Sequence, residues 1–148
     1  GRGLGYVDFG VRYKGYCSDV TVPFSIGTLN KEEEKIVKAV VSAYEETLKV
    51  LKPNVEVSYL FKVAEGIIKK NGFELKHGLG HGLGLNVHDF PSLIPSSKKS
   101  LERIKRNMIL TIEPGVYVKG VGGCRLENDF LITSKGYEVL TKSRFFKI

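Results

Sequence analysis

Residues 6–24 read YVDFGVRYKGYCSDVTVPF, and apolar side chains recur at every second position in both halves of this stretch. That spacing is the period of a β-strand, and the intervening RYKG is typical of a turn, so the stretch predicts a β-hairpin. A turn of even length places Asp8 and Asp19 on the same face, and a two-residue turn at Tyr13 and Lys14 places them directly opposite each other. We expect the other, apolar face to be the core face, with Val7, Phe9, Val20 and Val22.

The paired aspartates present an electrostatic problem, because like charges directly opposite one another destabilise a strand pair. Either Asp8 and Asp19 both face solvent on an exposed sheet face, or a cation lies between them and turns the repulsion into a set of ligands. The hairpin alone leaves both interpretations open.

The composition is that of one soluble globular domain: 148 residues, 42% hydrophobic and 26% charged. No apolar run approaches the ~18 residues of a membrane span, so we expect no membrane partner. The net charge is +7, but the lysines are scattered through helix-like segments rather than gathered with arginine and aromatic residues. We therefore expect no nucleic-acid partner.

The cysteines indicate the cellular compartment of the protein, and the first residues indicate that the sequence is part of a longer polypeptide. Cys17 and Cys124 lack the CxxC spacing of a zinc site and do not form a disulfide framework, which predicts reduced thiols and a cytoplasmic protein. The sequence does not begin with Met and already reads as a strand by Tyr6, which predicts a piece of a longer polypeptide.

Two helices are predicted after the hairpin. The apolar period predicts a helix over residues 31–51, with Asn30 and Glu33 as a capping box and Pro53 beyond its end. A second helix is predicted over residues 56–70, and Asn71-Gly72 is typical of its C-cap.

Short strands are predicted in the last third of the chain. MILTIEPGVYV (108–118), CRLENDFLIT (124–133) and YEVLT (137–141) read as strands, and residues 91–107 read as a loop with a weak helical turn. This order predicts an α+β fold in which the helices pack on one side of a mostly antiparallel sheet.

Two glutamates interrupt these otherwise apolar strands. Glu113 precedes Pro114, which favours an extended backbone and a strand end, and Glu127 shares a strand face with Arg125 and Asp129 by alternation. One such acid is usually a surface or salt-bridged residue, whereas several of them favour a shared site.

The three histidines, His77, His81 and His88, fall within twelve residues. His77 and His81 have the spacing of a helical zinc pair, but glycines at alternate positions exclude a stable helix. Glycines instead let the backbone approach a ligand closely, so the cluster favours a functional role. A nucleotide site is less favoured, since no phosphate-binding lysine or helix follows the glycines.

Four segments resemble, in order, the metal-site motifs of the pita-bread metallopeptidases: VDFGVRYKGYCSDVT, HGLGHGLGLNVHDFP, LTIEPGVYV and GCRLENDFLITSKGYEVLT. The sequence is most similar to the proline-specific branch, Xaa-Pro aminopeptidase and Xaa-Pro dipeptidase (prolidase), from Tyr6 to Thr141. The resemblance implies a curved, mostly antiparallel sheet with helices on one face. It also implies that residues 1–148 are the C-terminal portion of a catalytic domain whose N-terminal half is missing here.

The resemblance assigns the metal ligands. It implies that Asp8 binds one metal ion as a bidentate ligand and that Asp19 and Glu127 bridge both ions. It implies that His81 and Glu113 hold the second ion. Four carboxylates carry about four negative charges, which two divalent ions would balance. Oxygen ligands with one imidazole favour Mn²⁺, with Co²⁺, Fe²⁺ or Zn²⁺ as alternatives.

The resemblance also implies a reaction, hydrolysis of an N-terminal Xaa-Pro peptide bond by a metal-bridging hydroxide. In this scheme Glu113 takes up the proton, and His77 and His88 contact the substrate and stabilise the oxyanion. Arg125 would orient the bridging carboxylates from behind the ligands. The expected partner is a peptide with proline in second position, and a full-length parent could form a homodimer.

Several alternatives remain open. Arg125, two residues before the bridging Glu127, favours the proline branch over methionine aminopeptidase. Ser92 stands where archaeal-type prolidases often have arginine, which favours the aminopeptidase over the dipeptidase. A non-catalytic relative that binds protein or nucleic acid is a different class, disfavoured because all five ligands are present.

Overall fold

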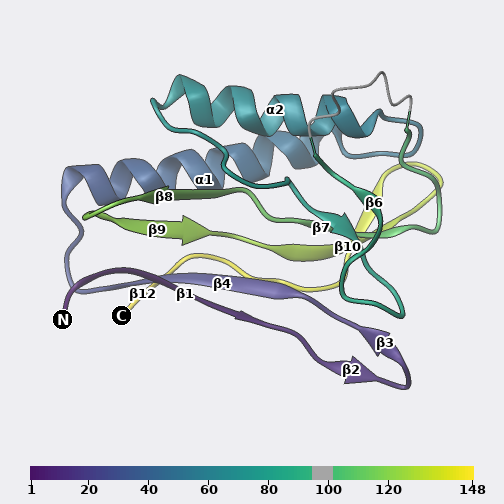
Figure 1. Ribbon diagram of the computed structural model, residues 1–148, viewed down its shortest axis with the longest axis horizontal. Helices are drawn as coiled ribbons and strands as arrows, with labels where there is room; N and C mark the ends of the chain where they lie inside the picture. The colour runs from purple at the N-terminus through teal and green to yellow at the C-terminus, as the bar shows by residue number, and fades with distance from the viewer. Residues whose placement is uncertain (95–101) are drawn as a thin grey trace.

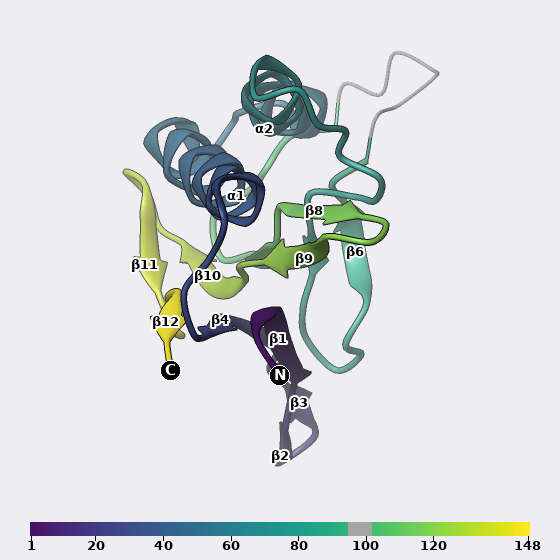
Figure 2. The ribbon, with the colours of Figure 1, turned by 90° about the vertical axis from the view of Figure 1, so that its left-hand side faces the viewer.

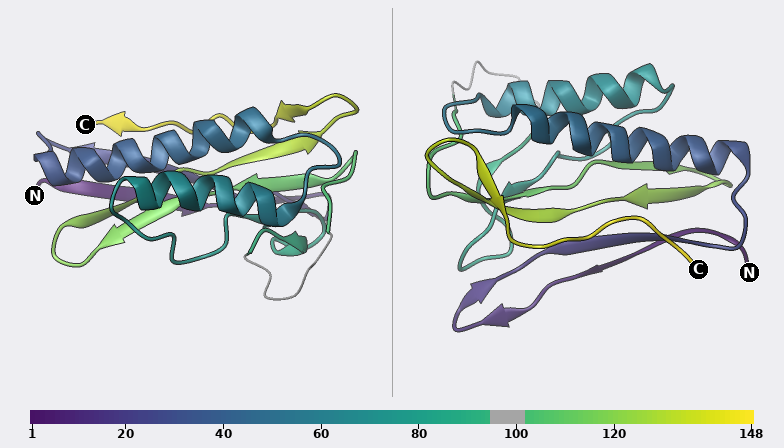
Figure 3. Two further views of the ribbon diagram at one scale, coloured as in Figure 1. Left: turned by 90° about the horizontal axis from the view of Figure 1, so that it is seen from above. Right: turned by 180° about the vertical axis from the view of Figure 1, so that it is seen from behind.

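Two helices lie side by side on one side of the strands (Figures 1 and 3). They are α1 (Lys31–Val50) and α2 (Val57–Lys70) in the computed structural model, which describes residues 1–94 and 102–148. Figure 2 shows the helices above β8, β9 and β10, with β1 and β4 farther from them. The predicted arrangement of helices on one side of the strands is confirmed.

The strands are β1 (Gly3–Phe9), β2 (Arg12–Tyr13), β3 (Tyr16–Cys17), β4 (Val20–Ile26), β5 (His81–Gly82), β6 (Asp89–Ser92), β7 (Ile109–Ile112), β8 (Gly115–Val118), β9 (Gly122–Arg125), β10 (Asn128–Ile132), β11 (Tyr137–Val139) and β12 (Phe146–Lys147). They form sheets in the orders β1-β4-β12 and β11-β10-β7-β5-β6, with the separate pairs β2-β3 and β8-β9. Among the residues that the structure describes, every strand pair except β12 with β4 is antiparallel, in agreement with the predicted, mostly antiparallel sheet.

The helix ends agree with the predicted caps. The Asn30 side chain accepts hydrogen bonds from the backbone N–H groups of Glu32 and Glu33, and the Glu33 carboxylate accepts one from the Asn30 N–H. This reciprocal pattern satisfies donors that a helix start leaves free. At the end of α2, Asn71 is the C-cap and Gly72 has φ +80°, a conformation that glycine adopts without strain.

The helices and the central strands enclose one hydrophobic core. The apolar stripe of each helix faces inward, so that burial of these side chains stabilises the two-layer arrangement. The core includes Ile36, Val40 and Ala43 of α1, Leu60, Ala64 and Ile68 of α2, and Leu110, Ile112, Phe130 and Ile132 of the strands. Among the described residues, no helix is both long and apolar enough to cross a lipid bilayer.

Two predicted strands are each divided in two. The segment 108–118 contains β7 and β8, separated at Glu113 and Pro114. The segment 124–133 contains the end of β9 and all of β10, separated at Leu126 and Glu127. Proline has no N–H group to continue a strand ladder. The breaks place both glutamates between strands rather than within them. Residues 95–101 of the predicted loop lie outside the described residues, so the helical turn there stays a prediction.

The hairpin turn lies within RYKG, as predicted, but one residue later than the Tyr13-Lys14 turn that would place Asp8 and Asp19 directly opposite each other. Tyr13 pairs with Tyr16, so Lys14 and Gly15 form the two-residue turn, with φ angles of +51° and +91°. Turns of this length favour positive φ at both positions, which glycine accepts more readily than tyrosine. In this register Asp8 faces Thr21 rather than Asp19. The two aspartates still share a face, but they are diagonal neighbours.

The predicted core face of this hairpin, by contrast, is wrong. Val7 and Phe9 are each 52% exposed, whereas Thr21 and Ser25 are fully buried. The polar face lies toward β9, because Arg125 and the neighbouring Glu127 hydrogen bond to Thr21. Strand alternation separates the two faces of a hairpin but does not say which one is inside.

Candidate metal centre

Five side chains from separate elements converge where the strands end or break. Asp8 lies near the end of β1, Asp19 precedes β4, His81 begins β5, Glu113 follows β7, and Glu127 lies between β9 and β10. Ligand atoms of Asp8, Asp19 and Glu127 lie within 4.8 Å of one another. Those of His81, Glu113 and Glu127 do so as well. Because Glu127 belongs to both groups, the predicted ligands form one cluster.

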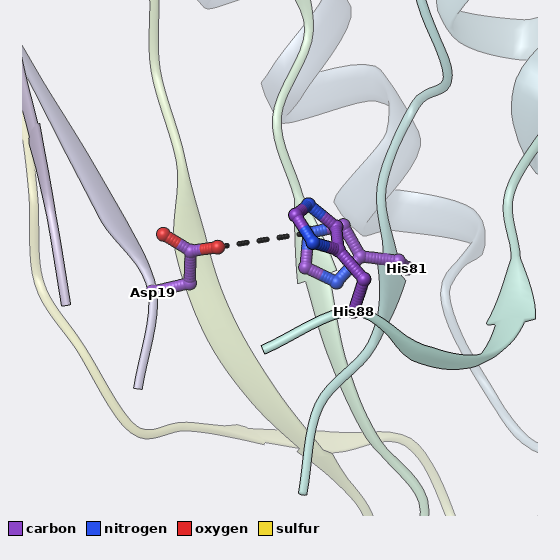
Figure 4. Close-up of side chains that lie close together, drawn as sticks. All are labelled: Asp19, His81 and His88. Carbon is purple, nitrogen blue, oxygen red and sulfur yellow. Dashed lines mark ion pairs between the residues drawn. The ribbon is translucent and has the colours of Figure 1, made fainter. Parts of the chain in front are cut away.

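A third group joins the two parts of this cluster. Asp19, His81 and His88 also offer atoms within 4.8 Å of one another, and the Asp19 carboxylate is directed at the His81 ring (Figure 4). Asp19 Oδ2 and Glu113 Oε1 each lie 3.6 Å from His81 Nε2, too far for a hydrogen bond. Two atoms that each bind one ion at about 2.1 Å lie roughly 3–3.5 Å apart. The distance of 3.6 Å from each carboxylate oxygen to His81 Nε2 is therefore close to the distance between two atoms that bind the same ion.

Burial makes this cluster costly to ionise without a cation. Burial raises the pKa of Glu113 to about 7 and that of Glu127 to about 8, and neighbouring carboxylates add to both shifts. Burial, and next the charge of Asp8, also raise the pKa of Asp19. Divalent cations would compensate these charges. The donor set and its electrostatics thus fit a pair of divalent ions.

His81 presents one ring nitrogen to the cluster. Its Nδ1 lies 3.0 Å from the carbonyl oxygen of Gly82, which leaves Nε2 facing Asp19 and Glu113. Burial lowers the pKa of His81. A neutral imidazole whose Nδ1–H donates to a carbonyl has its lone pair on Nε2, as a metal ligand requires.

Arg125 contacts one predicted ligand directly and another through Thr21. Its guanidinium group donates directly to Asp8 Oδ2, to the Tyr117 hydroxyl at 2.8 Å and to the Thr21 hydroxyl at 3.1 Å. Thr21 in turn donates to Glu127 Oε2 at 2.6 Å. Arg125 thus contacts Asp8 directly, and its hydrogen bonds reach Glu127 through Thr21.

The flanking histidines line a cavity of about 570 Å³ beside the cluster, together with Glu113, Tyr117 and Arg125. The His88 ring centroid lies 4.4 Å from that of His81. His77 Nε2 lies 3.0 Å from the Tyr117 hydroxyl, so Tyr117 connects His77 to Arg125. The cavity gives a substrate room next to the ligands.

Two of these residues, Thr21 and Tyr117, were not predicted from the sequence. Alternation places Thr21 on the face of Asp8 and Asp19, and that pattern is the signal that identifies it. Tyr117 lies in β8, in an apolar run that gives no such signal.

The model of metallopeptidase family M24 matches residues 3–134. The chain belongs to family M24. Uncharacterized peptidases of Staphylococcus epidermidis and Staphylococcus aureus are 42% and 40% identical to it over 137 and 136 residues. The match covers 91% and 90% of this M24 chain but 38% of each relative. The chain therefore spans about two fifths of the length of these relatives.

Solved M24-like structures confirm the pita-bread fold. A prolidase from Pyrococcus furiosus superposes with a TM-score of 0.89 at 34% identity, over 95% of this chain and 42% of that one. An X-Pro aminopeptidase from Thermotoga maritima gives 0.88 at 33% identity, over 98% and 42%. A Xaa-Pro dipeptidase from Bacillus anthracis gives 0.90 at 30% identity, over 98% and 41%. Structures named for either proline-specific activity resemble this M24 chain equally well.

Glycines in the histidine-rich segment let strands of the M24 chain approach one another. A Cβ at Gly82 would lie 2.1 Å from the carbonyl oxygen of Phe90, and one at Gly80 would lie 2.1 Å from that of Thr111. Both contacts are with backbone, which cannot move aside cheaply. The close approach that these glycines allow is thus between β5 and its neighbours.

We expect Gly82→Ala to destabilise the chain, because the added methyl group must separate β5 from β6. Overpacking of this kind costs about 1–3 kcal/mol, measured as the free energy of unfolding in urea. Gly136→Ala is the matched control, since nothing lies within 4 Å of its Cβ position. An unchanged urea midpoint for Gly82→Ala would contradict this packing.

Proposed function

We propose that this chain forms the dinuclear metal centre of an exopeptidase that removes the N-terminal residue from peptides with proline in second position. The observation that supports this most is that Glu127 belongs to both ligand groups, as a carboxylate that bridges two ions must. On this proposal, residues 1–148 are the ligand-bearing portion of a catalytic domain.

The ligands divide into two sets. Asp8, Asp19 and Glu127 would hold one ion, and His81, Glu113 and Glu127 would hold the other, with Asp19 near both. Oxygen donors with one imidazole favour Mn²⁺. A bound pair of divalent ions lowers the pKa of a water molecule and polarises a carbonyl group.

Glu113 is the proposed proton acceptor. Its carboxylate lines the cavity, and burial raises its pKa to about 7. A carboxyl group with a pKa near the working pH can take up and release a proton during one turnover. Glu113 would therefore hold a proton taken from water and return it to the leaving amine.

The flanking histidines are the proposed contacts to the substrate. His88 is exposed at the cavity, where its imidazole can donate to a peptide oxygen. His77 is oriented by Tyr117, and its Nδ1 lies 2.7 Å from the carbonyl oxygen of Gly78. Donors fixed in this way stabilise developing negative charge without reorganisation.

The test of the proposal uses the purified chain with added Mn²⁺. We expect it to bind two ions per molecule and to cleave a Xaa-Pro-Xaa tripeptide at least tenfold faster than the matching Xaa-Ala-Xaa tripeptide. Equal rates on the two peptides would refute the proline preference. A chain that binds no Mn²⁺ would refute the metal centre.

A second comparison distinguishes the aminopeptidase from the dipeptidase. Prolidase structures resemble this chain, but Ser92 lines the cavity. By the family resemblance, this is the position where archaeal-type prolidases often have an arginine that binds the carboxylate of a dipeptide. We therefore expect faster release of the first residue from Xaa-Pro-Xaa than from Xaa-Pro, measured as kcat/KM. A preference for the dipeptide would make the chain a prolidase.

A further inference from the structure

Thr21 is a fully buried residue of β4 that lies between the ligands and carries no charge. It pairs with Asp8 across the hairpin and lies two residues after Asp19 on the same face. A buried hydroxyl group must be hydrogen-bonded to offset the loss of water. Its partners therefore show what it does.

The Thr21 hydroxyl has two partners, and their chemistry fixes the direction of both hydrogen bonds. Arg125 Nε lies 3.1 Å away and can only donate, so the hydroxyl oxygen accepts there. Glu127 Oε2 lies 2.6 Å away, and the single hydroxyl proton is free to bond to it. Thr21 thus donates to Glu127 while Arg125 polarises the hydroxyl group.

This hydrogen bond restricts the rotation of the Glu127 carboxylate. Glu127 is only 2% exposed and offers oxygen atoms to both ligand groups, so its plane must be held in one orientation to serve both. Thr21 holds one of the two carboxylate oxygens, Oε2, by its hydrogen bond of 2.6 Å. Removing the Thr21 hydroxyl group would leave Glu127 Oε2 without this donor in a buried site.

The main chain reinforces the same contact. The carbonyl oxygen of Thr21 accepts a hydrogen bond from the Glu127 N–H at 3.2 Å and another from the Ser143 hydroxyl at 2.7 Å. Ser143 N–H also donates to Asn128, the residue after Glu127. The C-terminal segment therefore joins β4 to the segment between β9 and β10 that carries Glu127, and these hydrogen bonds hold Thr21 next to Glu127.

We propose that Thr21 is a positioning residue, which orients the Glu127 carboxylate and thereby sets the affinity of the chain for a pair of divalent ions. The inference rests on the proposed metal centre and adds to it a residue that binds no ion itself. Groups that orient a metal ligand typically contribute a factor of 10–100 in metal affinity.

The test compares Mn²⁺ binding to the metal-free chain by calorimetry in three variants. Thr21→Val keeps the shape but removes the hydroxyl group, and we expect a 10- to 100-fold weaker affinity for Mn²⁺. Thr21→Ser keeps the hydroxyl group, and we expect an affinity within about threefold of the original. Thr47→Val is the matched control, because Thr47 is equally buried but its hydroxyl donates to Ala43 within α1.

The outcomes separate this inference from the proposed function. If the unchanged chain binds two ions and Thr21→Val binds them equally well, the positioning role is refuted and the metal centre stands. If the unchanged chain binds no ion, the metal centre is refuted. Crystal structures of the metal-free proteins then decide the positioning role: a displaced Glu127 side chain in Thr21→Val supports it, and an unchanged one overturns it.

Discussion

Asp19→Asn is expected to abolish the uptake of both metal ions. Asp19 belongs to two of the three ligand groups, and its Oδ2 atom lies 3.6 Å from His81 Nε2. The amide is nearly the same size as the carboxylate, but it is neutral and offers one oxygen rather than two. The remaining ligands could not bridge two ions with a balanced charge, so peptide hydrolysis should be lost together with metal binding.

The measurement is metal content after dialysis against Mn²⁺, with calorimetry for affinity. We expect less than a tenth of the original occupancy. The fold should persist, because Asp129 accepts a hydrogen bond from the backbone N–H of Asp19, which the substitution leaves in place. Thermal unfolding of the metal-free variant should therefore occur no earlier than that of the original chain.

Asp89→Asn is the matched control for this prediction. Asp89 is exposed in β6, and its Oδ1 atom accepts a hydrogen bond from Phe90 N–H. This variant makes the same change of charge near the cluster but outside the ligand groups. Asp19→Asn with undiminished occupancy would contradict the proposed centre, whereas equal losses in both variants would indicate a general effect of charge.

A shared acidic site could be anticipated from the sequence pattern, whereas the choice of its five ligands came from the resemblance to the pita-bread metallopeptidases. Carboxylates and a histidine stand out in short apolar strands, and strand alternation places Asp8 and Asp19 on one face whatever the exact turn. The helix caps are local as well, since Asn30 and Glu33 satisfy each other within one turn. Local chemistry of this kind does not depend on the rest of the fold.

The side of the hairpin that faces inward could not be predicted in this way. Hydrophobic content favoured the face of Val7 and Phe9, but the inner face is decided by distant partners, Arg125 and Glu127. Thr21 could not be identified from the sequence for the same reason. A threonine in a strand is ordinary until the residue that it contacts, more than a hundred positions away, is known.

Loss of stability between pH 6.5 and 8.5 is expected for the metal-free chain. Burial raises the pKa of Glu113 to about 7 and that of Glu127 to about 8 in the folded chain, from an ordinary value of 4.5. In this range the folded state binds more protons than the unfolded state, so the free energy of unfolding falls as pH rises. The expected loss is about 2 kcal/mol.

In this range of pH, histidine contributes less to the change in stability than the two glutamates do. Burial lowers the pKa of His77 and of His81 below the ordinary value of 6.5, which would make stability rise with pH in the acidic range. In the folded chain both rings are mostly neutral above pH 6.5, and in the unfolded chain they lose their remaining protons by about pH 7.5, so their opposing effect is smaller than that of the carboxyl groups. Between pH 6.5 and 8.5 the change in the free energy of unfolding with pH is therefore determined mainly by the buried carboxyl groups. Urea unfolding at a series of pH values measures this change.

With added Mn²⁺, the free energy of unfolding should rise with pH between 6.5 and 8.5 instead of falling. Metal ligands bind in their ionised form, so binding strengthens as pH rises, and an ion that binds only the folded state stabilises it. Glu127→Gln should flatten the metal-free slope, whereas Glu138→Gln, a change at an exposed position of β11, should leave it unaltered. A metal-free chain whose stability rises from pH 6.5 to 8.5 would show that these carboxylates are ionised at little cost. In that case cations would not be needed to hold the four carboxylates together.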